Sequence, residues 1–261
     1  MCLILIAWKI QPNYRLVVAA NRDEIFSRPA AAAAFWPELP DVLAGRDLAA
    51  GGTWLGVSRH GRFAALTNYR EGGKTMANAP SRGALVADFL AGQVDPEPYL
   101  AALAVRGTDF NGFNLLVGDG ERLAYYANRR TAPRCLPPGV YGLSNHLLDT
   151  PWPKLAAAKS SFTKALLKLP EQAPFFDLLA DREIVADERL PNTGVALEWE
   201  RRLSAIFVSS PNYGTRASTV LTLRNDGQTT LVERSFGPDA QVLGEVHEQF
   251  HCIPLHQSSL I

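Results

Sequence analysis

Residues 2–24 read CLILIAWKIQPNYRLVVAANRDE, and the rest of the chain is organised around this stretch. Two continuous apolar runs, residues 3–8 and 16–20, are separated by a polar turn. Short apolar runs bounded by turn residues are typical of strands buried on both faces, so the pattern predicts a hairpin of two buried strands. In an antiparallel pair, the start of the first strand lies beside the end of the second. Cys2 is therefore expected near the polar cluster at residues 21–24.

The bulk composition is that of an ordinary globular protein. Of 261 residues, 47% are hydrophobic and 20% are charged, which is enough to bury a substantial core. We expect one domain over residues 1–261, because no linker, repeat or low-complexity segment divides the chain. The 26 basic and 26 acidic residues cancel, so the charge predicts no nucleic-acid partner and no attraction to an anionic membrane. No apolar run is long enough to predict a membrane span.

The three cysteines, Cys2, Cys135 and Cys252, are widely spaced and odd in number. This pattern argues against a disulfide framework and predicts a reducing compartment. The first apolar run is short and has no basic residue ahead of it, so it is typical of a buried strand rather than of a secretory signal. We therefore expect a cytoplasmic protein.

Strand patterns and helix patterns alternate in groups along the chain. After the hairpin, strand patterns occupy residues 54–58, 63–67, 113–118, 123–128, 140–144, 205–209, 219–224, 229–235 and 246–252. Helical spacing predicts helices at residues 84–90, 96–105, 153–169 and 174–180. The proline-rich residues 29–40 and the polar residues 181–199 are predicted to be loops. This order predicts helices packed on sheets, in a layered α/β or α+β domain.

Cys2 is the sharpest candidate for chemistry. A small residue at position 2 permits removal of the initiator methionine, after which the α-amine of the cysteine lies beside its own thiol. A free α-amine has a pKa of roughly 7.7–8.0, so it can take up the thiol proton and later return it to a leaving amine. Nucleophile and general base are then one residue. The alternative is a buried cysteine in a core strand, where this residue type is often found.

Polar residues at the ends of apolar segments are further candidates. An adjacent pair such as Arg22 and Asp23 can hold an ammonium or a thiolate in register; a solvated turn is the alternative. Asn68 and Asn145 each follow a short strand, where a side-chain amide can donate to a developing oxyanion, although asparagine is also an ordinary turn residue. Arg216 precedes a strand, and it can bind a substrate carboxylate, pair with Asp23 or lie on the surface.

No motif predicts a metal or a cofactor. His247 and His251 share a face of a predicted strand, but no cysteine or carboxylate lies at a metal-ligand spacing from them. We expect both to be structural histidines. The sequence contains no motif for phosphate or dinucleotide binding, for a zinc protease or for a serine hydrolase. Nothing in the spacing supports a papain-like Cys–His pair.

Six short motifs occur in order along the chain: Met1-Cys2-Leu3, Asn21-Arg22-Asp23-Glu24, Gly52-Thr53-Trp54-Leu55-Gly56, Thr67-Asn68-Tyr69-Arg70, Leu143-Ser144-Asn145 and Tyr213-Gly214-Thr215-Arg216. Together they resemble the NRDE family, also called the transport-and-Golgi-organisation 2 family. Each motif is short, and the ordered set, which runs from residue 2 to about residue 235, makes the likeness specific. The family is similar, at a greater distance, to N-terminal-nucleophile hydrolases of the bile salt hydrolase and penicillin V acylase type.

The resemblance implies an α+β fold, a four-layer αββα sandwich of the N-terminal-nucleophile hydrolase kind. It also implies a cysteine nucleophile exposed by methionine removal. Carried onto matching positions, the implied catalytic residues are Cys2, Asp23, Asn68, Asn145 and Arg216. The same motifs lead us to expect Asn21, Arg22, Trp54 and Tyr69 at the substrate. Arg22 and Asp23 are adjacent here, whereas the hydrolases separate the two, so we expect them to point to opposite faces of the strand.

Two classes of function follow. The first is hydrolysis of a non-peptide C–N amide: Cys2 attacks, its amine moves the proton, Asn68 and Asn145 hold the oxyanion, and a thioester forms and is hydrolysed. The second is a carrier for haem or an acyl-type ligand that uses the same cleft without turnover, in keeping with the family's links to Golgi organisation, haem trafficking and lipid metabolism. Haem needs an axial ligand, and the sequence offers no clear one. The expected partner is a small amide or acyl-type molecule, or haem; neither the substrate nor an oligomeric state is predicted.

Overall fold

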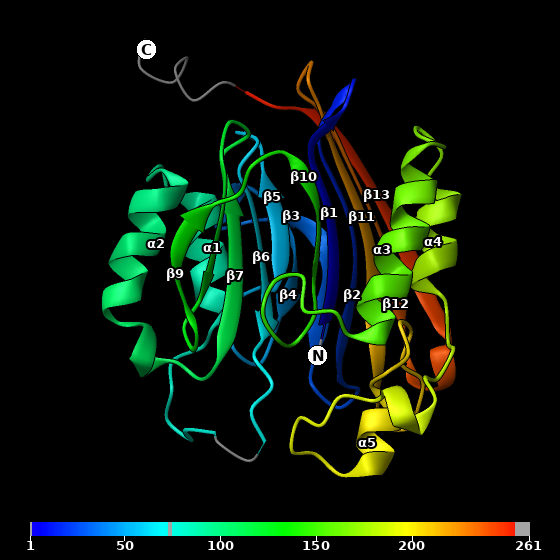
Figure 1. Cartoon of the computed structure of the whole chain (residues 1–261). Helices are drawn as coiled ribbons and strands as arrows, with labels where there is room; N and C mark the ends of the chain where they lie inside the picture. Colours follow the sequence, from blue (N-terminus) through cyan, green and yellow to red (C-terminus); the bar gives the residue numbers. More distant parts are fainter. Residues whose placement is uncertain (1, 73–74, 254–261) are drawn as a thin grey trace.

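The structure is a computed structural model, and it describes residues 2–72 and 75–253. Two β-sheets pack face to face, and a pair of helices covers the outer face of each sheet (Figure 1). The layers therefore run helix, sheet, sheet, helix. This arrangement confirms the α+β class and the four-layer αββα sandwich that the resemblance implies.

The sheet that contains Cys2 has six strands. In spatial order they are β10 (Gly139–Leu143), β1 (Cys2–Gln11), β2 (Tyr14–Ile25), β11 (Tyr213–Arg224), β12 (Gln228–Phe236) and β13 (Val242–His251). Its outer face is covered by α3 (Pro153–Leu166) and α4 (Ala173–Leu179), and a short helix, α5 (Leu197–Arg202), precedes β11.

The second sheet has seven antiparallel strands that follow one another in sequence order. They are β3 (Ala30–Trp36), β4 (Leu39–Asp47), β5 (Leu55–Ser58), β6 (Phe63–Asn68), β7 (Phe113–Gly118), β8 (Leu123–Ala127) and β9 (Thr131–Cys135). Its outer face is covered by α1 (Gly83–Ala91) and α2 (Pro96–Val105). In the described part of the chain, no helix is both long enough and apolar enough to cross a membrane.

The predicted N-terminal hairpin is confirmed, and its register brings Cys2 directly opposite Arg22. Both faces of β1 are buried, as its unbroken apolar run predicts. Alternate residues face the core between the sheets, namely Cys2, Ile4, Ile6 and Trp8, and the residues between them face the helices α3 and α4, namely Leu3, Leu5 and Ala7. This alternation aims the thiol of Cys2 into the space between the two sheets.

The prediction of a loop over residues 29–40 was wrong, because this segment supplies β3 and the beginning of β4. Pro29 and Pro37 lie just outside the strands, and Pro40 is only the second residue of β4. β3 is an edge strand of its sheet, and prolines are tolerated at edges and strand starts since no ladder hydrogen bond is lost there.

The prediction of a strand over residues 205–209 was also wrong. The segment is apolar because Ile206, Phe207 and Val208 are buried, not because it extends a sheet. The backbone of Val208 bonds to Thr215 alone: its N–H donates to the Thr215 hydroxyl at 2.9 Å, and its carbonyl accepts the Thr215 N–H at 2.8 Å. The predicted loop over residues 181–199 contains the start of α5.

Candidate active site

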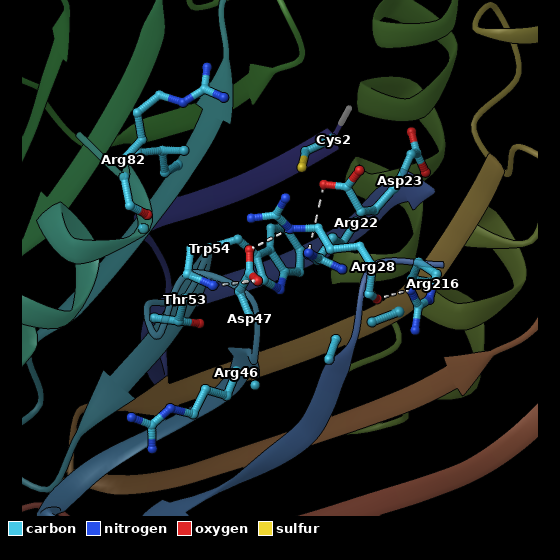
Figure 2. A pocket seen from close by; sticks show the side chains of 18 of the residues that line it. Cys2, Arg22, Asp23, Arg28, Arg46, Asp47, Thr53, Trp54, Arg82 and Arg216 are labelled. Carbon is cyan, nitrogen blue, oxygen red and sulfur yellow. Dashed lines mark hydrogen bonds and ion pairs between the residues drawn. The ribbon is translucent and has the colours of Figure 1, made fainter. Parts of the chain in front are cut away.

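A cavity of about 530 Å³ opens between the two sheets at the end where β1 begins. Its volume is typical of small-molecule sites. Both sheets contribute to its wall: Cys2, Arg22 and Asp23 come from β1 and β2, and Trp54 and Asn68 come from around β5 and β6 (Figure 2). The register of the first hairpin therefore brings the thiol and the polar strand end into one cavity.

The thiol of Cys2 is buried, with 8% of the residue exposed. Burial raises the pKa of the Cys2 thiol, and the negative charge of Asp23 adds to this effect. The charge of Arg22 and a backbone hydrogen bond from Asp23 lower the pKa in turn. Because the net shift is upward, the thiol is protonated near neutral pH and needs a base before it can act as a nucleophile. Met1, whose removal the mechanism requires, lies outside the described residues.

Asp23 is almost completely buried, with 2% exposed. Its carboxylate accepts a 2.7 Å hydrogen bond from the hydroxyl of Thr215 on β11, the residue directly opposite it in the sheet. The Tyr213 hydroxyl donates to the Asp23 carbonyl at 3.3 Å. Burial raises the pKa of the Asp23 carboxyl, and the positive charges of Lys154 and Arg70 lower it.

Lys154 is a residue of this site that the sequence analysis missed. It lies in the first turn of α3, is 5% exposed, and donates from Nζ to the Leu203 carbonyl at 2.8 Å. Burial lowers its pKa to about 8, although the charge of Asp23 acts to raise it. Close by, Arg70 and Glu200 form a buried ion pair with an N–O distance of 3.0 Å. A buried group of charges therefore lies beneath the strand end that carries Asp23.

The two candidate asparagines are joined but take different positions. Asn68 lines the cavity at the end of β6. Asn145 is fully buried and donates from Nδ2 to the Asn68 carbonyl at 3.0 Å. It is not among the described residues that line the cavity. The geometry therefore gives only Asn68 a direct approach to a ligand, with Asn145 holding its backbone from behind.

Arg216 lines the cavity, but its guanidinium is engaged with backbone. Nη1 donates to the carbonyls of Ile25, Phe26 and Arg28 at distances of 3.1, 3.2 and 2.7 Å. Figure 2 shows the Arg216 side chain turned toward Arg28 and away from Cys2. These three hydrogen bonds stabilise the turn that follows β2.

The four residues expected at the substrate divide into two pairs. Arg22 and Trp54 line the cavity, and Arg22 pairs with Glu24 at 3.8 Å. Asn21 points to the opposite layer, where Nδ2 donates to the carbonyls of Leu179 and Ile206 at 2.8 and 3.0 Å. Neither Asn21 nor Tyr69 belongs to the described lining of the cavity.

Tyr69 contacts a histidine instead, with 2.9 Å between its hydroxyl oxygen and Nε2 of His146. Arg22 and Asp23 were expected on opposite faces of β2. Arg22 lies opposite Cys2, whose side chain faces the core between the sheets, whereas the Asp23 carboxylate bonds to Thr215 and is affected by the charge of Lys154 on α3. The ladder between β2 and β11 has a bulge between Thr215 and Ala217, and the extra residue, Arg216, belongs to β11, so alternation along β2 continues.

The residues described here contain no cluster of three or more His, Cys, Asp or Glu side chains that could hold a metal ion. The cavity lining is rich in arginines and carboxylates instead, including the ion pair of Arg28 and Asp47 at 2.8 Å. This composition fits a polar organic ligand, and the thiol of Cys2 is the only strong nucleophile in the described wall.

A family model described as Transport and Golgi organisation 2 matches residues 1–238. The chain is 41% identical to the Transport and Golgi organization protein 2 homolog of Bos taurus over 259 residues, covering 90% of this chain and 93% of that protein. It is 39% identical to the homolog of Homo sapiens over 257 residues, with the same coverage. The likeness therefore extends over almost the whole length of both relatives.

Solved structures with a similar fold have little sequence in common with this chain. A C2A mutant of the conjugated bile acid hydrolase of Clostridium perfringens aligns over 99% of this chain and 94% of its own, with a TM-score of 0.50 and 9% identity. An N-acylethanolamine-hydrolyzing acid amidase ortholog of Caenorhabditis elegans aligns over 84% and 92%, with a TM-score of 0.49 and 12% identity. At these identities the comparison with the bile acid hydrolase establishes a shared fold.

Proposed function

This chain belongs to the Transport and Golgi organisation 2 family and has the fold of N-terminal-nucleophile hydrolases, and from this premise we propose that it hydrolyses a non-peptide C–N amide bond with Cys2 as nucleophile. The observation that carries the proposal is the position of Cys2. Cys2 lies in the wall of a cavity of about 530 Å³, directly opposite Arg22 in the hairpin, and the next residue of β2 is the buried Asp23.

The reaction needs a base because burial raises the pKa of the Cys2 thiol. In a chain that begins at Cys2, the α-amine accepts the thiol proton and the sulfur attacks the amide carbonyl. The C–N bond then breaks, the α-amine returns the proton to the leaving nitrogen, and a thioester remains on Cys2. Water hydrolyses the thioester, which releases the acid and restores the thiol.

The remaining residues take roles that match their contacts. Asp23, held by Thr215, orients the α-amine, and Arg22 stabilises the thiolate opposite it. The Asn68 amide donates to the oxyanion, which is the kind of pre-aligned donor that stabilises a tetrahedral intermediate. Asn145 positions Asn68 through its backbone.

The other expected residues surround this centre. Trp54 forms part of the wall that the substrate contacts. Arg216, Asn21 and Tyr69 act at a distance: Arg216 fastens the turn after β2, Asn21 anchors β2 to the helix layer, and Tyr69 contacts His146. We assign the activity to the cytosol, in keeping with three cysteines that are all free thiols.

No specific observation favours a carrier of haem or acyl-type ligands over an amidase. The described cavity wall contains no histidine, methionine or tyrosine, so Cys2 is the one side chain in it that would serve as an axial haem ligand.

The test is a panel of N-acyl amides and lactones incubated with the purified protein and with Cys2→Ala, with release of the amine or alcohol measured. We expect wild-type turnover of at least one amide and none with Cys2→Ala. Cys135→Ala is the matched control, because it removes an exposed thiol elsewhere, and it is expected to retain full activity. Equal turnover by wild type and Cys2→Ala would refute Cys2 as the nucleophile.

A further inference from the structure

One arginine of the cavity wall differs from the other four. Ion pairs join Arg22 to Glu24, Arg28 to Asp47 and Arg46 to Glu38, and three backbone carbonyls accept from Arg216. Arg82 is half-buried, and within the described chain no carboxylate lies at ion-pair distance from it. Its hydrogen bond from Nη1 to the Gly112 carbonyl, at 2.8 Å, leaves the other donors of the guanidinium without a charged partner.

A guanidinium that loses water without gaining an anion is costly. Burial lowers the pKa of Arg82, and the charges of Cys2 and Glu24 oppose this shift. The planar fork of an arginine side chain matches a carboxylate in a bidentate geometry. An anionic group of a ligand would therefore supply the ion pair that Arg82 does not form with any described carboxylate of the protein.

The charge of the cavity wall points the same way. Five arginines and four carboxylates line it. One of those carboxylates, Glu233, is buried among hydrogen-bond donors, and burial raises its pKa. The wall thus carries an excess of positive charge, which concentrates anions in a confined cavity.

Arg82 belongs to the same cavity wall as the nucleophile, and the charge of Cys2 affects the pKa of Arg82. Cys2 and Arg82 line one cavity from different sheets, since Arg82 immediately precedes α1 on the second sheet. In Figure 2, Arg82 and Asp23 lie on opposite sides of Cys2. A ligand whose carbonyl meets the thiol can extend toward Arg82 without leaving the cavity.

We propose that Arg82 binds a carboxylate on the substrate, so that the site takes amides that carry a carboxylate near the bond that is cleaved. The choice of an amide rests on the proposed function; the anion subsite at Arg82 does not, because it follows from the charge and position of that side chain. Arg82 is a specificity-determining residue in this scheme, and Cys2 performs the chemistry.

The test uses two reagents that alkylate thiols and differ only in charge: iodoacetylglycine, which ends in a carboxylate, and iodoacetylglycinamide, which ends in a neutral amide. The rate at which each modifies Cys2 is measured by peptide mass spectrometry. Both reagents attack the same thiolate, so any change in the pKa of Cys2 cancels in the ratio of the two rates. We expect Arg82→Gln to lower the ratio of the anionic to the neutral rate roughly tenfold.

Two further variants separate a specific contact from a general charge effect. Arg82→Lys keeps the charge and is expected to retain most of the preference. Arg106→Gln makes the same change in net charge at an exposed residue outside the cavity, and it is expected to leave the ratio unchanged. A ratio that is equal in wild type and Arg82→Gln, or that falls as far in Arg106→Gln, would overturn the proposal.

A competition experiment on the wild-type protein tests the anion subsite without any variant. The competitors are N-acetylglycine, which carries a carboxylate, and the neutral N-acetylglycinamide; neither alkylates thiols. We expect N-acetylglycine to slow labelling of Cys2 by iodoacetylglycinamide at a lower concentration than N-acetylglycinamide does. Equal protection by the two competitors would count against the subsite. None of these measurements requires turnover. Failure of amide hydrolysis with a preserved charge preference refutes the hydrolase alone, and turnover without charge preference refutes the subsite alone.

Discussion

Cys2 and Asp23 depend on a few neighbouring side chains for their charge states. Cys2 lies opposite Arg22 in the hairpin, and Asp23 lies opposite Thr215 in the next strand pair. Lys154, beneath them, is the buried cation whose charge lowers the pKa of Asp23. Burial raises the pKa of Asp23, and the charge of a lysine that is itself buried opposes this shift.

Replacing this lysine has a consequence for stability that depends on pH. The pKa of Lys154 is about 8 in the folded protein, against roughly 10.4 for an unfolded lysine. The unfolded chain thus binds more protons between these values, and the stability of the wild type rises as pH increases through this window. Lys154→Met lacks this pH-dependent contribution to the free energy of unfolding. The wild-type free energy of unfolding is expected to gain about 2 kcal/mol relative to Lys154→Met between pH 7 and pH 10.

Urea denaturation at the two pH values measures this difference directly. Lys164→Met is the matched control, because Lys164 is exposed on the same helix. The free energies of unfolding of wild type and Lys164→Met are expected to differ by nearly the same amount at both pH values. A constant difference between wild type and Lys154→Met would show that Lys154 is not a buried, titrating group.

The sequence indicates some of these residues better than others. Cys2 and Asp23 lie at the ends of two apolar runs, and a hairpin brings such ends together. Lys154 and Arg82 carry one weaker signal: each is a cation at the start of a helix, where the helix dipole favours anions. Asn21 belongs to the same motif as Asp23, yet its amide bonds to carbonyls of Leu179 and Ile206. Contacts between residues so distant in sequence are set by tertiary packing, which no local pattern reports.

Among the elements, the approach of α1 to the loop before β5 shapes the cavity. A Cβ placed on Gly52 would overlap the backbone of Gly83, only 2.7 Å from its carbonyl oxygen. The same carbonyl accepts the Thr53 N–H at 3.2 Å. Glycine at position 52 thus lets the beginning of α1, and with it Arg82, close against the second sheet.

Gly52→Ala is therefore expected to lower the free energy of unfolding by about 1–3 kcal/mol, because the helix must shift to accept the methyl group. Urea denaturation measures the loss. Gly244→Ala is the control, since a Cβ at Gly244 meets nothing within 4 Å, and it should change stability little. Equal stabilities for wild type and Gly52→Ala would contradict the close packing of Gly52 on Gly83.

The element predictions were most accurate where an apolar pattern is flanked by turn residues; the interior strand β4, whose apolar residues 42–44 are few, was not predicted. α2 and β7 have the predicted bounds, because an apolar pattern and flanking turn residues mark both. The two edge strands of the second sheet, β3 and β9, were missed: one contains an alanine run and the other contains Pro133. Edge strands have one unpaired side, so they tolerate residues with low strand propensity and lose the pattern that reveals them.

For the whole molecule, Glu233 ties the two sheets together beside the cavity. It belongs to β12 of the first sheet and accepts the Ala33 N–H of β3 in the second sheet at 2.7 Å. Its other oxygen accepts from the Thr219 hydroxyl at 3.1 Å. This bridge crosses from one sheet to the other at residues far apart in sequence, so only the assembled sandwich reveals it.

Removing the bridge should destabilise the sandwich. Glu233→Ala leaves a buried N–H without an acceptor, and we expect a loss of about 1–3 kcal/mol relative to Glu233→Gln. The glutamine keeps an acceptor for Ala33, and the Thr219 hydroxyl can rotate to accept from the new amide. Both variants are compared by urea denaturation. If glutamine costs as much as alanine, the hydrogen bond between the sheets is not what Glu233 contributes.

The layered fold as a whole was within reach of the sequence, because groups of strands alternate with pairs of helices and the ordered motifs resemble a known family. The hairpin alone led us to expect that β1 and β2 meet at one site, and the resemblance led us to expect that β6 and β11 reach it as well. The charge distribution in the cavity was not predicted, because it depends on which arginines form ion pairs with carboxylates from other parts of the sandwich.

The measurement that tests the central claim most directly is the intact mass of the active protein, taken before and after mixing with an N-acyl amide that it hydrolyses. We predict a mass lower than that of the full sequence by one methionine residue and, during turnover, an acyl adduct that maps to Cys2. An active protein that retains Met1 and carries no acyl group on Cys2 at any time in the reaction would contradict the account.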